Sequence, residues 1–201
     1  LNSFYHAFPK REYVERWIAQ VPAAFRFDVK LSGDFSEDPS GAAKGAVMER
    51  FLRAVEPFVT SKRLGVFLMT VPPSFTPEKH RLEELDELVK NLAPHTLAVE
   101  LRHRGWVEGE QRRATLDFFR ARKLVLVSVD LAQVKADRVL PWIEETTHPH
   151  TAYVRLHGRN PNYAKAGSTT EGHHHDYTQK ELEEIVPRLR ALEKSVKEVH
   201  V

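Results

Sequence analysis

The chain has 201 residues, of which 41% are hydrophobic and 29% charged, and its formal net charge at pH 7 is only +2. This balance is typical of a globular protein, and without a basic block it gives no support for a nucleic-acid or membrane partner. The absence of cysteine excludes disulfides, a thiolate nucleophile and a cysteine-ligated metal, and it fits a reducing, cytoplasmic location. No apolar run reaches the roughly 18 residues that a membrane-spanning helix needs.

Segments with helical period and segments with strand period alternate along the chain. The pattern predicts helices over residues 11–20, 42–56, 77–92, 109–122 and 178–197. It predicts strands over residues 25–30, 65–71, 97–102, 124–130 and 152–157, with a further apolar alternation at 198–201. Residues 32–41 and 158–177 are predicted to be loops. Thr76 is expected to cap the third helix, Thr178 and Glu181 to form a capping box, and Pro187 to kink or break the last helix.

The order of strands and helices predicts the fold class. Alternating strands and helices with apolar strands indicate a parallel sheet. The chain has no glycine-rich phosphate loop of the kind that an open doubly wound sheet carries after an early strand. We therefore predict a single domain over residues 1–201 with the α/β fold of a TIM (β/α)8-type barrel. Because such barrels run to about 250 residues, the first strand and the end of the last strand are expected to be missing from this chain.

Four of the predicted strands carry charged or ionisable side chains on one face. Side chains of a strand alternate between its two faces, so Arg155 and His157 lie opposite Val154. The carboxyl ends of barrel strands form the active site in this fold. The residues expected to point into that site are Lys30, Glu100, Arg102, Asp130, Arg155 and His157.

These side chains predict an anion-binding site. An inward charge is stable only when it is paired with another charge or with a ligand. Arginine forks suit phosphate and carboxylate groups. We expect Lys30, Arg102, Arg155 and Arg159 to hold a small anion, and Trp106 either to wall the pocket or to pack beneath its loop. A purely structural ion-pair network is the alternative.

The same cluster contains candidates for proton transfer and for metal binding. Glu100 and His157 form the predicted acid–base pair, and Asp130 is expected to orient them. With Asp130 they could also hold Mn, Mg or Zn, but no further fixed ligand is evident, and the run of residues 173–175, three consecutive histidines, cannot point at one ion in regular structure. No metal is therefore predicted, and the cofactor is left open.

Ordered motifs along the whole chain resemble a known family. They are Asn2-Ser3-Phe4-Tyr5, Trp17 with Val21-Pro22, Phe25 to Lys30, Leu64 to Leu68 with Pro72 to Phe75, Ala98 to His103 with Trp106, and Tyr153 to Arg159 with Tyr177. This set resembles the YecE-like family, domain of unknown function 72. The resemblance implies a TIM-type barrel whose opening Gly-Thr-Ser-Gly-Trp-like strand and closing Phe-Asn-Asn-like segment lie outside this chain. It adds Tyr5 and Tyr177 to the candidate ligand-binding residues, and it brings no established activity.

The sequence therefore predicts an enzyme that acts by acid–base chemistry on a small anionic metabolite, phosphorylated or carboxylated. Two alternatives stay open: a non-catalytic module that binds an anion at the same strand ends, and a metal-dependent sugar isomerase or endonuclease-like barrel. The substrate, the reaction and the oligomeric state are not determined by the sequence.

Overall fold

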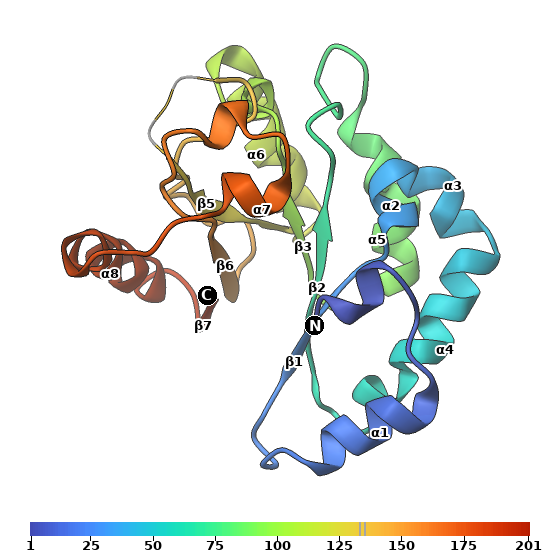
Figure 1. Cartoon of the computed structure of the whole chain (residues 1–201). Coiled ribbons are helices and arrows are strands. Elements are labelled where there is room, and N and C mark those ends of the chain that lie inside the picture. The colour runs from blue at the N-terminus through green and yellow to red at the C-terminus, as the bar shows by residue number, and fades with distance from the viewer. Residues whose placement is uncertain (133, 135) are drawn as a thin grey trace. The chain divides into compact units, whose positions relative to one another are not determined.

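The computed structural model describes residues 1–132, 134 and 136–201 (Figure 1). The chain forms two compact units. The first, called here the N-terminal unit, comprises residues 1–71 and 81–98, and the second, the C-terminal unit, comprises residues 72–80 and 99–201.

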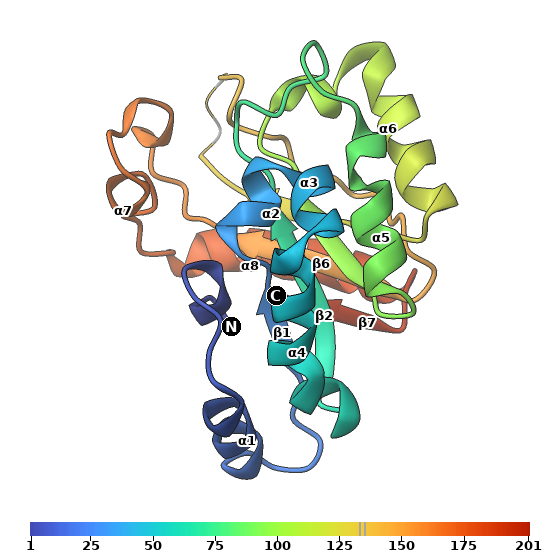
Figure 2. The ribbon, with the colours of Figure 1, turned by 90° about the vertical axis from the view of Figure 1, so that its right-hand side faces the viewer.

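The N-terminal unit packs helices against a short parallel sheet. Strand β1 pairs with β2 in parallel, with Lys30 opposite Leu68, and Phe67 N donates to the Thr96 carbonyl at the start of β3 at 3.0 Å. Figure 2 shows α1 and α4 of this unit together with β1 and β2. Its elements are η1 (Ser3–Tyr5), α1 (Arg11–Ala19), β1 (Phe27–Lys30), α2 (Gly33–Glu37), α3 (Pro39–Lys44), α4 (Ala46–Thr60), β2 (Leu64–Thr70), η2 (Leu82–Leu85), α5 (Asp86–Leu92) and the first half of β3 (Leu97–Glu100).

An aromatic cluster forms the core of the N-terminal unit. The Phe51 side chain, on α4, is fully buried. Its ring lies 5.5 Å from the ring of Phe67 on β2, 5.5 Å from Phe35 and 6.2 Å from Phe4, measured between centroids. The edge and tilted contacts within this cluster are the arrangements that aromatic quadrupoles favour. Phe51 thus joins α4 to the sheet and to the chain's first turn.

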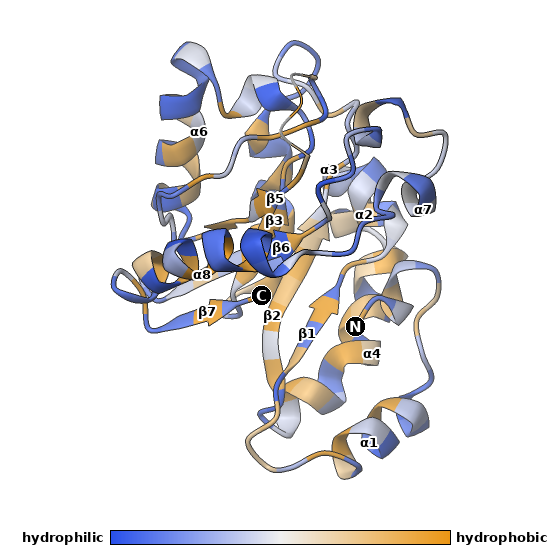
Figure 3. Cartoon of the chain, turned by 60° about the vertical axis from the view of Figure 1, so that its left-hand side comes forward, coloured by the Kyte–Doolittle hydropathy of each residue, from blue (hydrophilic) through white to orange (hydrophobic). Residues whose placement is uncertain are grey.

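The C-terminal unit contains the remaining strands. Strands β5 and β6 are parallel, with Asp130 opposite Leu156, and β6 and β7 are also parallel. Figure 3 shows hydrophilic and hydrophobic residues mixed along α8, the helix that precedes β7, as expected of a helix with one covered and one exposed face. The elements are the end of β3, η3 (Arg104–Trp106), α6 (Gly109–Ala121), β4 (Val125–Leu126), β5 (Ser128–Asp130), β6 (Thr151–Leu156), η4 (Tyr163–Lys165), α7 (Thr169–Gly172), α8 (Gln179–Glu193) and β7 (Glu198–His200).

Helix α8 covers the apolar face of β6. Ala152 and Val154 of β6 form a buried cluster with Leu192 of α8, so the alternation predicted for this strand is confirmed. The predicted capping box is confirmed as well, because the Thr178 and Glu181 side chains each accept the other's backbone N–H. A kink or a break is predicted at Pro187; the helix is not broken there, since α8 runs through Pro187 to Glu193, and the kink stays a prediction.

The parallel pairing and the α/β class match the prediction, but a closed barrel does not appear. Hydrogen-bonded strands of the described residues form two sheets, β1 to β4 and β5 to β7. Between β4 and β5, the Val127 N–H still donates to the Val99 carbonyl at 3.0 Å, and from Ser128 onward the ladder pairs with β6. The predicted TIM-type barrel is therefore not confirmed.

The predicted loop 32–41 is wrong, because it contains α2 and the first half of α3. The Asp38 side chain accepts the Gly41 N–H at 2.9 Å, and Pro39 occupies the first helical position. This combination starts a helix even where the apolar period is weak. The helix predicted over 42–56 is divided at Gly45 and continues through Pro57 to Thr60.

The helix predicted from Thr76 is also wrong at its start. Lys79 and His80 donate to the Thr76 carbonyl and close only one turn. Arg81 is then extended, with φ −127° and ψ 143°, and the helical segment begins at Leu82. An extended residue before the leucine stripe therefore shortens the helix to η2 and α5.

Truncation of Phe51 tests the aromatic core. We expect Phe51→Ala to lower the free energy of unfolding by about 3 to 5 kcal/mol, the usual cost of removing a buried phenyl ring. The neighbouring Leu52 is 39% exposed, so Leu52→Ala should cost less than about 1 kcal/mol. Urea unfolding monitored by circular dichroism measures both values, and equal losses in the two variants would contradict this account of the core.

Candidate functional site

The Glu100 carboxylate at the end of β3 is the centre of the site in the C-terminal unit. It is 1% exposed. Its Oε1 lies 3.2 Å from Arg102 Nε and 3.1 Å from His157 Nε2, and its Oε2 accepts a hydrogen bond from Arg155 Nη1. Arg155 lies on β6 and His157 directly follows its end. They reach the same carboxylate because residues two apart in an extended chain share a face. We call these four residues the Glu100 cluster.

The surroundings of Glu100 keep it ionised. Burial opposes its ionisation, but the hydrogen bond and charge of His157 and the charges of Arg155 and Arg102 bring the pKa of Glu100 from 4.5 down to about 2. A buried carboxylate is stable only when cations and donors replace its lost hydration. The cluster supplies two guanidinium groups for one carboxylate, which leaves a local excess of positive charge before His157 is counted.

Two further aromatic rings extend the cluster from His157. The His173 ring stacks on the His157 ring, with centroids 4.8 Å apart, and also stacks on the Tyr163 ring, with centroids 5.5 Å apart. Burial, reinforced by the positive charges of His157 and Arg102, lowers the pKa of His173 to about 4. His173 is therefore neutral at pH 7, and its buried Nε2 has no hydrogen-bond partner among the described residues.

A cavity of about 300 Å³ adjoins this stack. The Arg102 and Arg138 side chains line it, and Arg138 donates from Nη2 to the backbone carbonyls of Tyr163 and Ala166. Within the described part of the chain Arg138 has no carboxylate partner, so its charge is not neutralised. Small residues leave the space open, and the remaining lining is Pro73, Tyr163, Ala166, Gly167, Ser168, Gly172 and His173.

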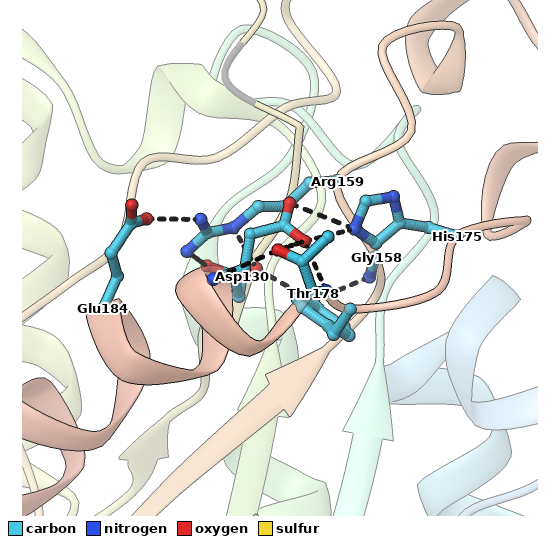
Figure 4. Close-up of polar contacts among 8 residues, drawn as sticks. Asp130, Gly158, Arg159, His175, Thr178 and Glu184 are labelled. Atoms are coloured by element: carbon cyan, nitrogen blue, oxygen red, sulfur yellow. Dashed lines mark hydrogen bonds and ion pairs between the residues drawn. The ribbon is translucent and has the colours of Figure 1, made fainter.

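A second buried carboxylate, Asp130 at the end of β5, has its own partners (Figure 4). Arg159 donates to both of its oxygens at 2.9 Å, and the Tyr177 hydroxyl donates at 2.8 Å. Arg159 also binds Glu184 of α8 at 2.7 Å. Burial and the bond to Asp130 raise the pKa of Tyr177 above its ordinary value, so this phenol stays protonated. We call Asp130, Arg159, Tyr177 and Glu184 the Asp130 network.

The turn after β6 fixes the position of the Asp130 network. Gly158 has a φ of +85°, and a Cβ added there would lie 2.8 Å from the Cβ of His175. Only glycine adopts this conformation without strain. Its N–H donates to the Tyr177 hydroxyl at 2.9 Å, and the His175 ring binds Glu181 at 3.2 Å (Figure 4). The turn therefore holds the strand end, the following loop and the start of α8 together.

The structure brings together part of the predicted site. Glu100, Arg102, Arg155 and His157 meet as expected, whereas Asp130, Arg159 and Tyr177 form the adjacent Asp130 network. Trp106 is 2% exposed, and its Nε1 donates to the Phe75 carbonyl at 2.6 Å. It packs as a core residue and does not line the cavity.

Lys30 and Tyr5 belong to the N-terminal unit, where the Lys30 ammonium lies 4.3 Å from the centroid of the Tyr5 ring. The sequence did not single out Arg138, Tyr163 or the stacking role of His173, because all three lie in segments without helical or strand period. The histidine run was the one available signal. It marks the stack through His173 alone, since the side chain of His175 points to Glu181.

In the described ranges, no group of three or more His, Asp or Glu side chains is arranged to hold a metal ion. None of the helices formed by those residues is long and apolar enough to cross a membrane.

Fold and site together define an α/β protein with parallel strands and a buried cluster of ion pairs at the strand ends. The chain belongs to the family described as protein of unknown function DUF72, whose model matches residues 1–201. This match confirms the predicted relationship.

Relatives of the chain include a curated protein and two solved structures. UPF0759 protein YunF of Bacillus subtilis is 27% identical over 99% of this chain and 73% of its own length. A crystal structure of a DUF72 family protein of Enterococcus faecalis V583 has a TM-score of 0.89 at 25% identity, over 100% of this chain and 75% of that one. A DUF72 family protein of Thermotoga maritima MSB8 has a TM-score of 0.80 at 29% identity, over 98% and 73%.

The depressed pKa of Glu100 predicts a specific dependence of stability on pH. A carboxylate with a lowered folded-state pKa stabilises the fold fully above its unfolded value of 4.5, and this contribution is lost as the pH falls towards 2. Between pH 5 and pH 3 the wild type should therefore lose about 2 kcal/mol more than Glu100→Gln. Urea unfolding at several pH values measures the difference. Glu193→Gln, at an exposed position of α8, is the control and should keep the wild-type profile; parallel profiles for wild type and Glu100→Gln would contradict the burial argument.

Proposed function

We propose that the protein is an enzyme that acts by acid–base chemistry on a small anionic metabolite, phosphorylated or carboxylated. The observation that carries this proposal is the Glu100 carboxylate shared by Arg102, Arg155 and His157. This arrangement places two positively charged guanidinium groups, which can bind an anion, beside an imidazole, which can donate or accept a proton. The ligand would bind at the carboxyl ends of β3 and β6, where parallel α/β folds commonly place their sites.

The anion would be held by guanidinium groups. Arg102 connects the Glu100 cluster to the 300 Å³ cavity, where it is joined by Arg138. Arg155 is partly exposed, with 23% of its side chain accessible, so it retains donors for a ligand. Guanidinium forks match the oxygens of phosphate and carboxylate, and their strength increases in a partly desolvated site. The cavity is at the lower end of the size range of small-molecule sites.

His157 would carry the proton. A carboxylate with a pKa of about 2 is a weak base at pH 7, so Glu100 acts best as the partner that orients the His157 ring and stabilises its charged form. An imidazole oriented in this way is a candidate general acid or base. In this proposal His157 is the acid–base group that exchanges the proton with the ligand, and Glu100 is the partner that orients it.

Asp130 would position the site and take no part in proton transfer. Its oxygens accept three hydrogen bonds from Arg159 and Tyr177. Its backbone carbonyl also accepts the backbone N–H of His157 at 3.0 Å. Because the His157 ring contacts Glu100, this bond connects the surroundings of Asp130 with those of Glu100. We propose that Arg159 and Tyr177 share this positioning role.

A non-catalytic anion-binding module is the second candidate. The strong ionisation of Glu100 favours it, because a carboxylate held in fixed ion pairs can position arginines for anion recognition without any proton transfer. The (β/α)8 barrel also remains our proposal for the architecture, supported by the parallel strand pairs and the repeated strand–helix order.

Replacement of Arg155 tests anion binding. Inorganic phosphate and a panel of sugar phosphates and carboxylic acids should raise the melting temperature of the wild type, by about 5 to 10 °C when a ligand is present at about 100 times its Kd. Arg155→Gln should abolish the shift. Arg113→Gln removes a guanidinium whose side chain is 92% exposed on α6, and this control should retain it. Retention of the shift in Arg155→Gln would rule out the proposed anion site.

Replacement of His157 distinguishes between the two proposed functions, an enzyme and a non-catalytic binding module. For a ligand found in that panel, nuclear magnetic resonance of the mixture should detect its conversion by the wild type. His157→Asn should lower the rate by 10²-fold or more, the usual contribution of a general acid or base, and should change the melting shift much less. A bound ligand that the wild type leaves unchanged over a day would favour the binding module over the enzyme.

A further inference from the structure

A second cavity lies within the N-terminal unit, and none of its lining residues belongs to the Glu100 cluster or the Asp130 network. Its volume is about 600 Å³, within the range of small-ligand sites. Three stretches that are distant in sequence line it: the segment from His6 to the start of α1, the start of α2, and α4. The lining is His6, Ala7, Phe8, Pro9, Arg11, Ser32, Asp34, Arg50, Arg53 and Ala54.

The charges around this cavity are not balanced. Arg11 is paired, because it donates to Glu15 at 2.7 Å and to Glu56. Arg50 and Arg53 have no carboxylate partner in the part of the chain that the structure describes. Asp34, the only acidic side chain in the lining, accepts the Ser32 hydroxyl at 3.0 Å. Two guanidinium charges therefore face the cavity against one carboxylate.

The two unpaired arginines are arranged on one side of α4. They are three residues apart, a spacing that places both side chains on the same face of a helix. The Arg50 guanidinium carbon lies 5.8 Å from the centroid of the Phe8 ring, and Phe8 in turn contacts the buried Phe51 with centroids 5.8 Å apart. Stacking on an aromatic ring steadies a guanidinium while its edge N–H groups stay available to an anion.

The wall beside these arginines is apolar. Phe8, Pro9 and Ala54 line the same cavity, and Ala54 is buried on α4. A ligand with an anionic end and a hydrophobic end would satisfy both parts of the lining. A phosphate monoester carries a charge of about −1.5 to −2 at pH 7, which matches the two unpaired arginines better than a single carboxylate does.

We propose that this cavity is a second ligand site, specific for a phosphate monoester with an aromatic or aliphatic group. Arg50 and Arg53 bind the phosphate oxygens, and the organic group packs on Phe8 and Pro9. The site shares no residue with the proposed active site, so it stands or falls separately from the proposed function.

Isothermal titration calorimetry of the whole chain with phenyl phosphate tests the proposal. Arg50→Gln/Arg53→Gln should weaken binding at this site at least tenfold, and Phe8→Ala should weaken phenyl phosphate more than inorganic phosphate. Arg102→Gln/Arg155→Gln should leave this binding event unchanged and remove only an event at the other site. Circular dichroism checks that each variant is folded, and Arg113→Gln is the control for loss of an exposed charge.

Three results would overturn the proposal. One is unchanged phenyl phosphate affinity in the folded Arg50→Gln/Arg53→Gln variant. Another is an equal loss in Arg113→Gln, which would indicate non-specific charge attraction. The third is equal displacement by chloride and by inorganic phosphate at matched ionic strength. Because the double variants of the two sites are measured separately, failure at one site does not decide the other.

Discussion

The burial of the Glu100 carboxylate is the constraint on which the ends of β3 and β6 depend. A carboxylate removed from water is stable only beside cations and donors, and here they come from two strands. Arg102 follows Glu100 on its own strand, whereas Arg155 and His157 are contributed by β6. Arg155 and His157, which stabilise Glu100 from the other strand, therefore also fix the separation of these strand ends. The groups that would bind a ligand are held by the same bonds that hold the fold.

Asp130 poses the same physical problem, and its partners solve it differently. Arg159 and Tyr177 fill the lone pairs of its oxygens, and Glu184 neutralises the remaining face of Arg159. This network has one guanidinium for two carboxylates, so it carries no excess of positive charge. The Glu100 cluster has more cations than anions, and its neighbour Arg138 has no carboxylate partner among the described residues. Of the two buried carboxylates, only Glu100 therefore lies in a cluster with an excess of positive charge.

How far the site could be predicted depends on whether its residues lie in periodic structure. The two-residue alternation of β6 places Arg155 and His157 on one face, and the alternation around β3 does the same for Glu100 and Arg102. Both predictions follow from strand geometry alone. Arg138 and His173 lie in irregular segments, where position is determined by tertiary contacts such as the stacking on Tyr163. A single sequence carries no local signal for such contacts.

The two arginine groups differ in how much water surrounds them, and this difference determines what each can recognise. Arg102 and Arg155 are largely buried, with 23% of each side chain accessible, and they already hold a carboxylate. A ligand must compete with Glu100 there, so geometry and proton position matter. Arg50 and Arg53 are exposed and have no carboxylate partner among the described residues, so their attraction for an anion is screened by water and more sensitive to salt. Aromatic support from Phe8 compensates by restricting one guanidinium before binding, which lowers the entropy that a ligand must overcome. Burial therefore favours chemistry at the strand ends, while exposure favours reversible binding at α4.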